Sequence, residues 1–121
     1  MIILVVDDYA DARETLKVLL EMSGHLVIEA ANGSQAVEAA TISVPDVILM
    51  DWAMPVMDGF AATRILRAQP ETSKIRIVAV TADGNNPASR NTALLSGCDA
   101  CYAKPLDFTR LDEILRGDGI R

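Results

Sequence analysis

An apolar run near the middle of the chain constrains the fold most. Residues 47–50 read Val-Ile-Leu-Met, and successive side chains of a strand point to opposite faces of its sheet. A strand formed here would therefore be hydrophobic on both faces, which is typical of the interior of a parallel sheet. The run ends at Asp51, within the stretch Val44–Gly59 (VPDVILMDWAMPVMDG). Ligand chemistry gathers at the carboxyl ends of parallel strands, so we expect Asp51 to be either a metal ligand or a nucleophile.

The rest of the chain alternates between strand-like and helix-like patterns. Strands are predicted at 2–6, 26–30, 46–50, 75–80 and 100–103, and helices from about 11 to a stop near 24, then at 34–42, 60–68, 88–96 and about 106–116. Strands that are joined by helical crossovers lie parallel, and right-handed crossovers place helices on both faces. We therefore predict one doubly wound α/β domain.

Length and composition agree with a single domain. A chain of 121 residues is long enough for one core, and residues 116–121 are expected to be a frayed tail or the start of a linker. Hydrophobic residues make up 50% of the chain but aromatic residues only 4%, so the core must be aliphatic. The net charge of −6 argues against direct binding of nucleic acid, which depends on Lys and Arg.

The sequence carries no membrane or export signal that we recognise. The apolar run at 2–6 has no basic region before it and is far shorter than the ~20 residues of a membrane span. We expect a cytoplasmic protein without a membrane partner. Cys98 and Cys101 form a C-x-x-C pair, but the pair precedes a strand and no second ligand pair accompanies it. We interpret both as reduced core or loop thiols.

Polar residues follow the predicted strands at one edge of the sheet. Asp7 and Asp8 follow the first strand, Asp51 the third, Thr81 the fourth and Lys104 the fifth. Alone, the first pair would be interpreted as caps of the next helix, but together these residues indicate a site. Carboxylates ~4 Å apart repel each other by several kcal/mol, and a hard cation such as Mg²⁺ offsets that repulsion. With an ammonium and a hydroxyl nearby, the arrangement suits an acyl phosphate on an aspartate.

Four motifs give the chain a family resemblance. They are VVDD at 5–8, ILMDWAMPVMDG at 48–59, VAVTA at 78–82 and AKP at 103–105. In this order and at these strand ends, they resemble the receiver domains of two-component response regulators. The resemblance covers essentially the whole chain. It implies a flavodoxin-like five-stranded parallel sheet in the order 2-1-3-4-5, with five helices on both faces.

The resemblance implies a role for each residue of the site. Asp51 would be the phosphoacceptor. Mg²⁺, or Mn²⁺ in its place, would be bound directly by Asp8, Asp51 and the backbone carbonyl of Ala53, and through water by Asp7. Thr81 would hydrogen-bond the phosphoryl group, and Lys104 would pair with Asp51 or with its phosphate. The peptide bond between Lys104 and Pro105 would be cis.

The sequence also departs from the family pattern. Many receivers have an aromatic switch residue three positions before the lysine, where this chain has Cys101. Tyr102 comes one position later and should face the other side of its strand, so which of the two relays the switch stays open. Ala53 and Asp83 occupy positions that tune the phosphate lifetime in the family. Trp52 is expected to be partly exposed at the rim, either touching a partner kinase or covering the loop.

The favoured function is a phosphorylation-controlled switch rather than a turnover enzyme. The phosphoryl group would come from a histidine kinase or a His-phosphotransfer protein. The downstream effector stays unassigned, and a phosphorylation-dependent homodimer is left open. An aspartate-dependent phosphohydrolase would need a second acid where Ala53 stands, and a flavin-binding domain would need a phosphate-binding loop at residues 7–9. A degenerate receiver that acts only as an interaction module is the remaining alternative.

Overall fold

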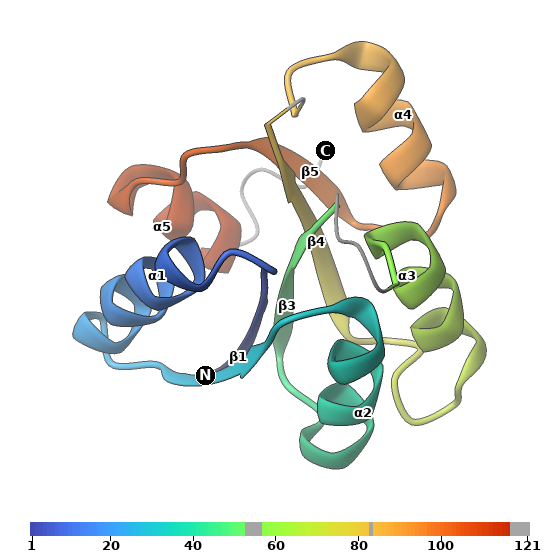
Figure 1. Ribbon diagram of the computed structural model, residues 1–121, viewed down its shortest axis with the longest axis horizontal. Helices are drawn as coiled ribbons and strands as arrows, with labels where there is room; N and C mark the ends of the chain where they lie inside the picture. Colours follow the sequence, from blue (N-terminus) through green and yellow to red (C-terminus); the bar gives the residue numbers. More distant parts are fainter. Residues whose placement is uncertain (53–56, 83, 117–121) are drawn as a thin grey trace.

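The computed structural model describes residues 1–52, 57–82 and 84–116, and in these ranges five strands alternate with five helices (Figure 1). The strands are β1 (Ile2–Val6), β2 (Leu26–Ala30), β3 (Val47–Asp51), β4 (Arg76–Thr81) and β5 (Ala100–Ala103). The helices are α1 (Ala10–Met22), α2 (Gly33–Ser43), α3 (Gly59–Ala68), α4 (Pro87–Leu95) and α5 (Phe108–Arg116). The predicted alternation is confirmed.

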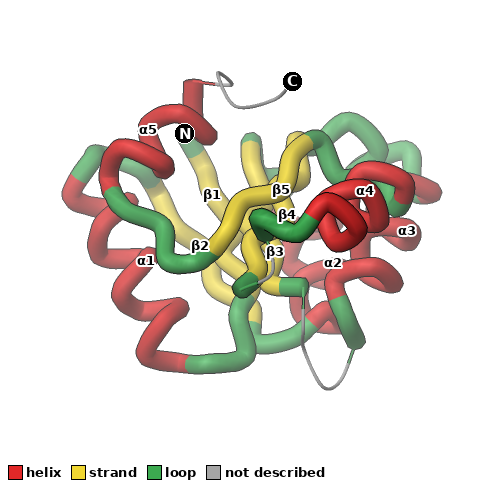
Figure 2. The backbone as a smooth tube through the Cα atoms, turned by 90° about the horizontal axis from the view of Figure 1, so that it is seen from above, coloured by secondary structure: helices red, strands yellow, loops and turns green. Residues whose placement is uncertain are grey.

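All strand pairs are parallel, and the sheet has the order β2-β1-β3-β4-β5. Helices α1 and α5 cover one face, and α2, α3 and α4 cover the other (Figures 1 and 2). The chain reverses its direction of winding between β1 and β3, which are neighbours in the sheet. This is the topological switch point, where ligand sites form in open α/β sheets. The predicted doubly wound fold and strand order are confirmed.

The sheet separates two aliphatic clusters. Ile48 and Met50 of β3 belong to the cluster under α2, α3 and α4, whereas Val47 and Leu49 belong to the cluster under α1 and α5. All five residues of β3 are buried. The central strand is thus covered on both faces, as its uniform hydrophobicity predicts.

Strand β3 is shifted by one residue from its predicted bounds of 46–50. The backbone N–H of Asp46 donates to the carbonyl of Ile2 at 2.8 Å, and its carboxylate accepts from the N–H of Ile2 at 2.7 Å. Asp46 therefore fixes the entry to β3 from outside the strand. Asp51, in turn, belongs to β3 and lies opposite Val80 of β4. The key carboxylate is held by the sheet rather than by a loop.

Two further features frame the carboxyl edge of the sheet. The peptide bond between Lys104 and Pro105 is cis, as the resemblance implied. Helix α5 begins after Asp107, whose carboxylate accepts from the N–H of Arg110 at 2.9 Å and caps the helix. Within the described ranges, none of the helices combines the length and the apolar character that a membrane crossing requires.

Candidate functional site

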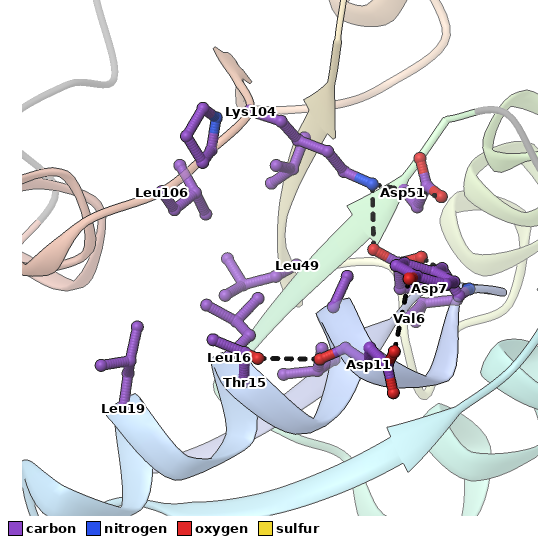
Figure 3. A pocket seen from close by; sticks show the side chains of 15 residues that line it. Val6, Asp7, Asp11, Thr15, Leu16, Leu19, Leu49, Asp51, Lys104 and Leu106 are labelled. Carbon is purple, nitrogen blue, oxygen red and sulfur yellow. Dashed lines mark hydrogen bonds and ion pairs between the residues drawn. The ribbon is translucent and has the colours of Figure 1, made fainter.

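The carboxyl ends of β1, β3, β4 and β5 bring the predicted site residues to one edge of the sheet. Asp7 and Asp51 are each 7% exposed and Thr81 is 9% exposed, whereas Asp8 is open to solvent. Figure 3 shows Lys104 reaching from the end of β5 toward Asp51 and Asp7. Residues from both ends of the chain thus meet beside the central strand.

Three carboxylates form the acidic part of the site. Asp7, Asp8 and Asp51 each offer one oxygen atom, and these oxygens all lie within 4.8 Å of one another. Oxygen donors at this spacing fit a hard divalent cation, because Mg²⁺ prefers carboxylates and water over nitrogen or sulfur ligands. Two of the three carboxylates are buried, so their mutual repulsion is poorly screened. The spacing and the chemistry of these oxygens therefore fit a divalent cation.

Lys104 already supplies one positive charge. Its Nζ lies 2.9 Å from Asp7 Oδ2 and 3.5 Å from Asp51 Oδ2. Burial opposes the charge of the ammonium, but the hydrogen bond to Asp7 and the attraction of Asp51 outweigh burial and raise the pKa of Lys104. The resemblance implied a pair with Asp51, and in the structure Asp7 is the nearer partner. The three carboxylates of the cluster outnumber this ammonium.

Asp7 is held at several atoms. Its N–H donates to the carbonyl of Ala30 at 3.1 Å, and its Oδ1 accepts from the N–H of Tyr9 at 2.9 Å. Arg13 Nη1 donates to its backbone carbonyl at 2.8 Å, while Arg13 Nε lies 3.1 Å from Glu29 of β2. Arg13 thereby ties the loop that carries Asp7 to the neighbouring strand.

The role of Arg13 was not predicted from the sequence. The sequence nevertheless contains one indication of this role. The helix dipole disfavours a cation near the N-terminus of a helix. Arg13 stands in the first turns of α1. A basic residue there, shortly after two aspartates, needs a specific acceptor to offset that cost.

The loop after Thr81 lies against the end of β5. The carbonyl of Thr81 accepts from the N–H groups of Lys104 at 2.9 Å and Gly84 at 3.1 Å. A Cβ on Gly84 would lie 2.3 Å from the backbone nitrogen of Ala103, so only glycine fits. Arg90 of α4 donates to the carbonyls of Gly84 and Cys101 at 3.1 and 2.6 Å. A change at Thr81 therefore has direct contacts through which to reach β5 and α4.

Cys101 and Tyr102 face opposite sides of the sheet, as strand alternation predicts. Cys101 belongs to the cluster under α2, α3 and α4, and Tyr102 to the cluster under α1 and α5. The Tyr102 hydroxyl is buried without a hydrogen-bond partner among the described residues. Cys98 and Cys101 are buried free thiols, in agreement with the interpretation of the C-x-x-C pair.

The expected exposure of Trp52 is wrong. Its side chain is only 8% exposed and packs on Phe60 of α3, with ring centroids 4.1 Å apart. The missing side chain of Gly59 makes room for the indole, because a Cβ there would lie 2.5 Å from Trp52 Cε3. Trp52 is a core residue beside the site rather than a rim residue. Ala53 and Asp83 lie outside the described residues, so the predictions for them stay predictions.

The sequence of residues 3–116 matches the family model of the response regulator receiver domain. The chain belongs to this family. Among curated relatives, protein PilH of Pseudomonas aeruginosa is 46% identical over 79 residues, which cover 65% of each chain. The phosphate regulon transcriptional regulatory protein PhoB of the same species is 36% identical over 97% of this receiver domain and 52% of PhoB. The chain thus spans about half to two thirds of the length of these relatives.

Solved structures of receiver domains superimpose closely on this one. Chemotaxis protein CheY4 of Vibrio cholerae gives a TM-score of 0.88 at 28% identity and covers 96% of each chain. The receiver domain of the sensor histidine kinase PA1611 of P. aeruginosa gives a TM-score of 0.87 at 36% identity, covering 96% of this chain and 94% of that one. The PA1611 receiver is described with a magnesium ion coordinated in its active-site cleft.

Proposed function

We propose that this receiver domain accepts a phosphoryl group on Asp51 from a phosphohistidine, in a reaction that depends on Mg²⁺. The observation that carries the proposal is the meeting of Asp51, two further carboxylates and Lys104 at the switch point of the sheet. The donor would be a histidine kinase or a His-phosphotransfer protein. The domain would act as a switch and not as a turnover enzyme, in the cytoplasm, where its free thiols stay reduced.

The donor set of the acidic cluster supports a divalent cation. Asp8 and Asp51 would bind it directly, together with the carbonyl of Ala53. Asp7 Oδ1 and Oδ2 already accept from Tyr9 and Lys104, so contact with the cation through water suits Asp7 better. When bound, the cation supplies charge neutralisation and holds phosphoryl oxygens in place. Its charge would also offset the excess of carboxylates over the ammonium of Lys104.

The chain's own groups account for the transfer step. An oxygen of Asp51 attacks phosphorus, and a P–O bond forms as the P–N bond of the phosphohistidine breaks. The imidazole nitrogen leaves with the bonding electron pair. Lys104, 3.5 Å from Asp51, would stabilise charge on the phosphoryl oxygens, and the hydroxyl of Thr81 would donate to one of them. Hydrolysis of the acyl phosphate by water would return the carboxylate.

The switch would act through the loop after Thr81. An acyl phosphate adds roughly 1.5 to 2 negative charges and strong hydrogen-bond acceptors. Movement of Thr81 toward it would alter the contacts of Gly84 with Ala103 and of Arg90 with Cys101. The surface of α4 and β5 would then change between two states.

The other candidates are less well supported. A phosphohydrolase of this kind needs a second acid two residues after its nucleophile, and position 53 is alanine. A degenerate receiver has no need of three clustered carboxylates with a lysine between two of them.

The proposal is tested by incubating the domain with acetyl phosphate, a small donor of phosphoryl groups, with Mg²⁺ or with a chelator. The intact mass should increase by one phosphoryl group only with Mg²⁺. Incorporation that is equal in the presence of a chelator would overturn the proposed metal dependence.

A further inference from the structure

A cavity of about 330 Å³ lies between α1 and the junction of β5 with α5 (Figure 3). Its floor includes Leu49 and Val80 from the central strands, and its walls include Leu16 and Leu19 of α1 and Leu106. This volume lies within the range of roughly 300–1,000 Å³ that is typical of small-ligand pockets.

The walls of the cavity have unburied apolar surface. Leu16, Leu19 and Leu106 pack against the cluster under α1 and α5 but stay only partly buried. Protein interiors are close-packed, with few voids larger than a water molecule. An apolar group that entered the cavity would bury these leucines, which is favourable by about 25 cal/mol for each Å² removed from water.

Charged side chains gather at one end of the cavity, away from the leucines (Figure 3). Asp7, Asp51, Asp11 and Lys104 line it, and Lys104 is engaged with the first two. The carboxylate of Asp11 accepts from the hydroxyl of Tyr9 at 3.3 Å. In the described part of the chain, Asp11 has no ion-pair partner. An apolar cavity thus opens beside a carboxylate that pairs with no cation of the described residues.

We propose that this cavity binds a small amphipathic cation, with its apolar body among the leucines and an ammonium group against Asp11. Charge complementarity favours a cation, because an anion would meet the three carboxylates that line the cavity. A neutral ligand would fill the apolar space but would lack the ion pair with Asp11.

Occupancy would be coupled to the acidic site, since Asp7 and Asp51 belong to both. A bound ammonium and a divalent cation at the carboxylates repel each other. Each should therefore weaken the other by the same factor, as linkage requires. This inference needs the acidic cluster but not phosphoryl transfer, so it can hold or fail independently of the proposed function.

The test uses three probes that share one body and differ in charge: 2-phenylethylammonium, 2-phenylethanol and 3-phenylpropanoate. Each is titrated into ¹⁵N-labelled domain without Mg²⁺ and followed by NMR. Chemical shifts should change at Ala12, Leu16 and Leu106. The ammonium probe should bind at least about threefold more tightly than the alcohol, which is the gain that an exposed ion pair allows. The carboxylate probe should bind most weakly.

Two variants locate the ligand. Ala12 lines the cavity from α1. Ala12→Leu should therefore fill the cavity and abolish binding of the ammonium and alcohol probes. The control Ala88→Leu, on the exposed surface of α4, should leave binding of both probes unchanged. Asp11→Asn should lower the affinity of the ammonium probe to that of the alcohol. Glu14→Gln, on the same helix but outside the lining of this cavity, should change neither affinity.

Three results would overturn the proposal. The first is equal affinity of the wild-type domain for the three probes, and the second is shift changes confined to other regions. The third is an ammonium probe whose affinity does not change in Asp11→Asn. The wild-type series needs no variant, so the test holds even where a substitution prevents folding. Repeating the titration with saturating Mg²⁺ should weaken the ammonium probe, and unchanged affinity would contradict the coupling.

Discussion

The ammonium group of Lys104 lies closer to Asp7 than to Asp51, at 2.9 Å against 3.5 Å. These contacts join the carboxyl ends of β1, β3 and β5 through one side chain. The Lys104 ammonium thus lies in the negative potential of these carboxylates, which would also attract a metal ion. Under the proposed function, Lys104 would compete with the metal ion for these carboxylates before phosphoryl transfer and would pair with the phosphoryl group afterwards.

Replacement of Lys104 tests this double role. Lys104→Met should raise the affinity for Mg²⁺ by about tenfold, because the resident cation no longer repels the metal. The same variant should accept phosphoryl groups more slowly, because charge on the phosphoryl oxygens loses its partner. Mg²⁺ affinity can be measured by calorimetry and transfer by intact mass over time. Lys74→Met, at an exposed position, is the matched control, and equal Mg²⁺ affinity in both variants would contradict this account.

Arg13 should act on the metal through Asp7. Its hydrogen bond to the Asp7 carbonyl and its ion pair with Glu29 fix the loop that carries the first two carboxylates. Loss of such outer contacts typically costs about 10- to 100-fold in metal affinity. Arg13→Gln should weaken Mg²⁺ binding by about tenfold, whereas Arg64→Gln on the exposed surface of α3 should not. Unchanged Mg²⁺ affinity in Arg13→Gln would show that the loop is held without it.

Trp52 should report on the site from the core. It is the only tryptophan of the chain and directly follows Asp51, and its ring is packed on Phe60. Its fluorescence should change on addition of Mg²⁺ and again on addition of acetyl phosphate or beryllofluoride. Asp8→Asn should shift the Mg²⁺ response to higher concentration. A flat signal under conditions where calorimetry detects bound Mg²⁺ would contradict this prediction.

The fold and the main site residues follow from the sequence because they depend on local patterns. The uniform hydrophobicity of residues 47–50 predicts a doubly covered strand, and the strand ends predict the edge where Asp51 and Lys104 meet. Distances across the sheet do not follow from such patterns. That Lys104 lies nearer to Asp7 depends on how β1 and β5 are placed around β3.

The burial of Trp52 and the role of Arg13 were missed for the same reason. Whether Trp52 is exposed depends on Phe60 and on the space left by Gly59, both of which belong to the next helix. Arg13 finds Glu29 only because β1 pairs with β2 in a register that places Val5 opposite Glu29. Both outcomes are set by tertiary packing rather than by propensity.

The buried thiols predict how stability depends on pH. Burial raises the pKa of the Cys98 thiol to about 12, above its ordinary value of 9.0, and burial likewise raises the pKa of Cys101. Between pH 9 and pH 12, the Cys98 thiol of the folded state therefore keeps a proton that the unfolded state has lost. The stabilisation is therefore complete below pH 9 and is lost as pH rises toward 12, by up to about 1.4 kcal/mol per pH unit for one thiol.

Urea unfolding at several pH values measures this effect. The free energy of unfolding should fall above pH 9, and it should fall less steeply in Cys98→Ala. At pH 8 in the absence of urea, both thiols should react slowly with a thiol reagent, since the reactive thiolate is disfavoured. A stability that stays constant up to pH 11, or rapid labelling of the folded domain, would contradict the burial of these residues.

The central claim is that Asp51 receives the phosphoryl group. The wild-type domain, Asp51→Asn and Asp58→Asn should be incubated with acetyl phosphate and Mg²⁺ and compared by intact mass. Asp58→Asn is a matched control because Asp58 caps α3, a position that asparagine fills equally well. The account predicts one added phosphoryl group in the wild type and in Asp58→Asn, and none in folded Asp51→Asn. Full incorporation into Asp51→Asn would contradict it.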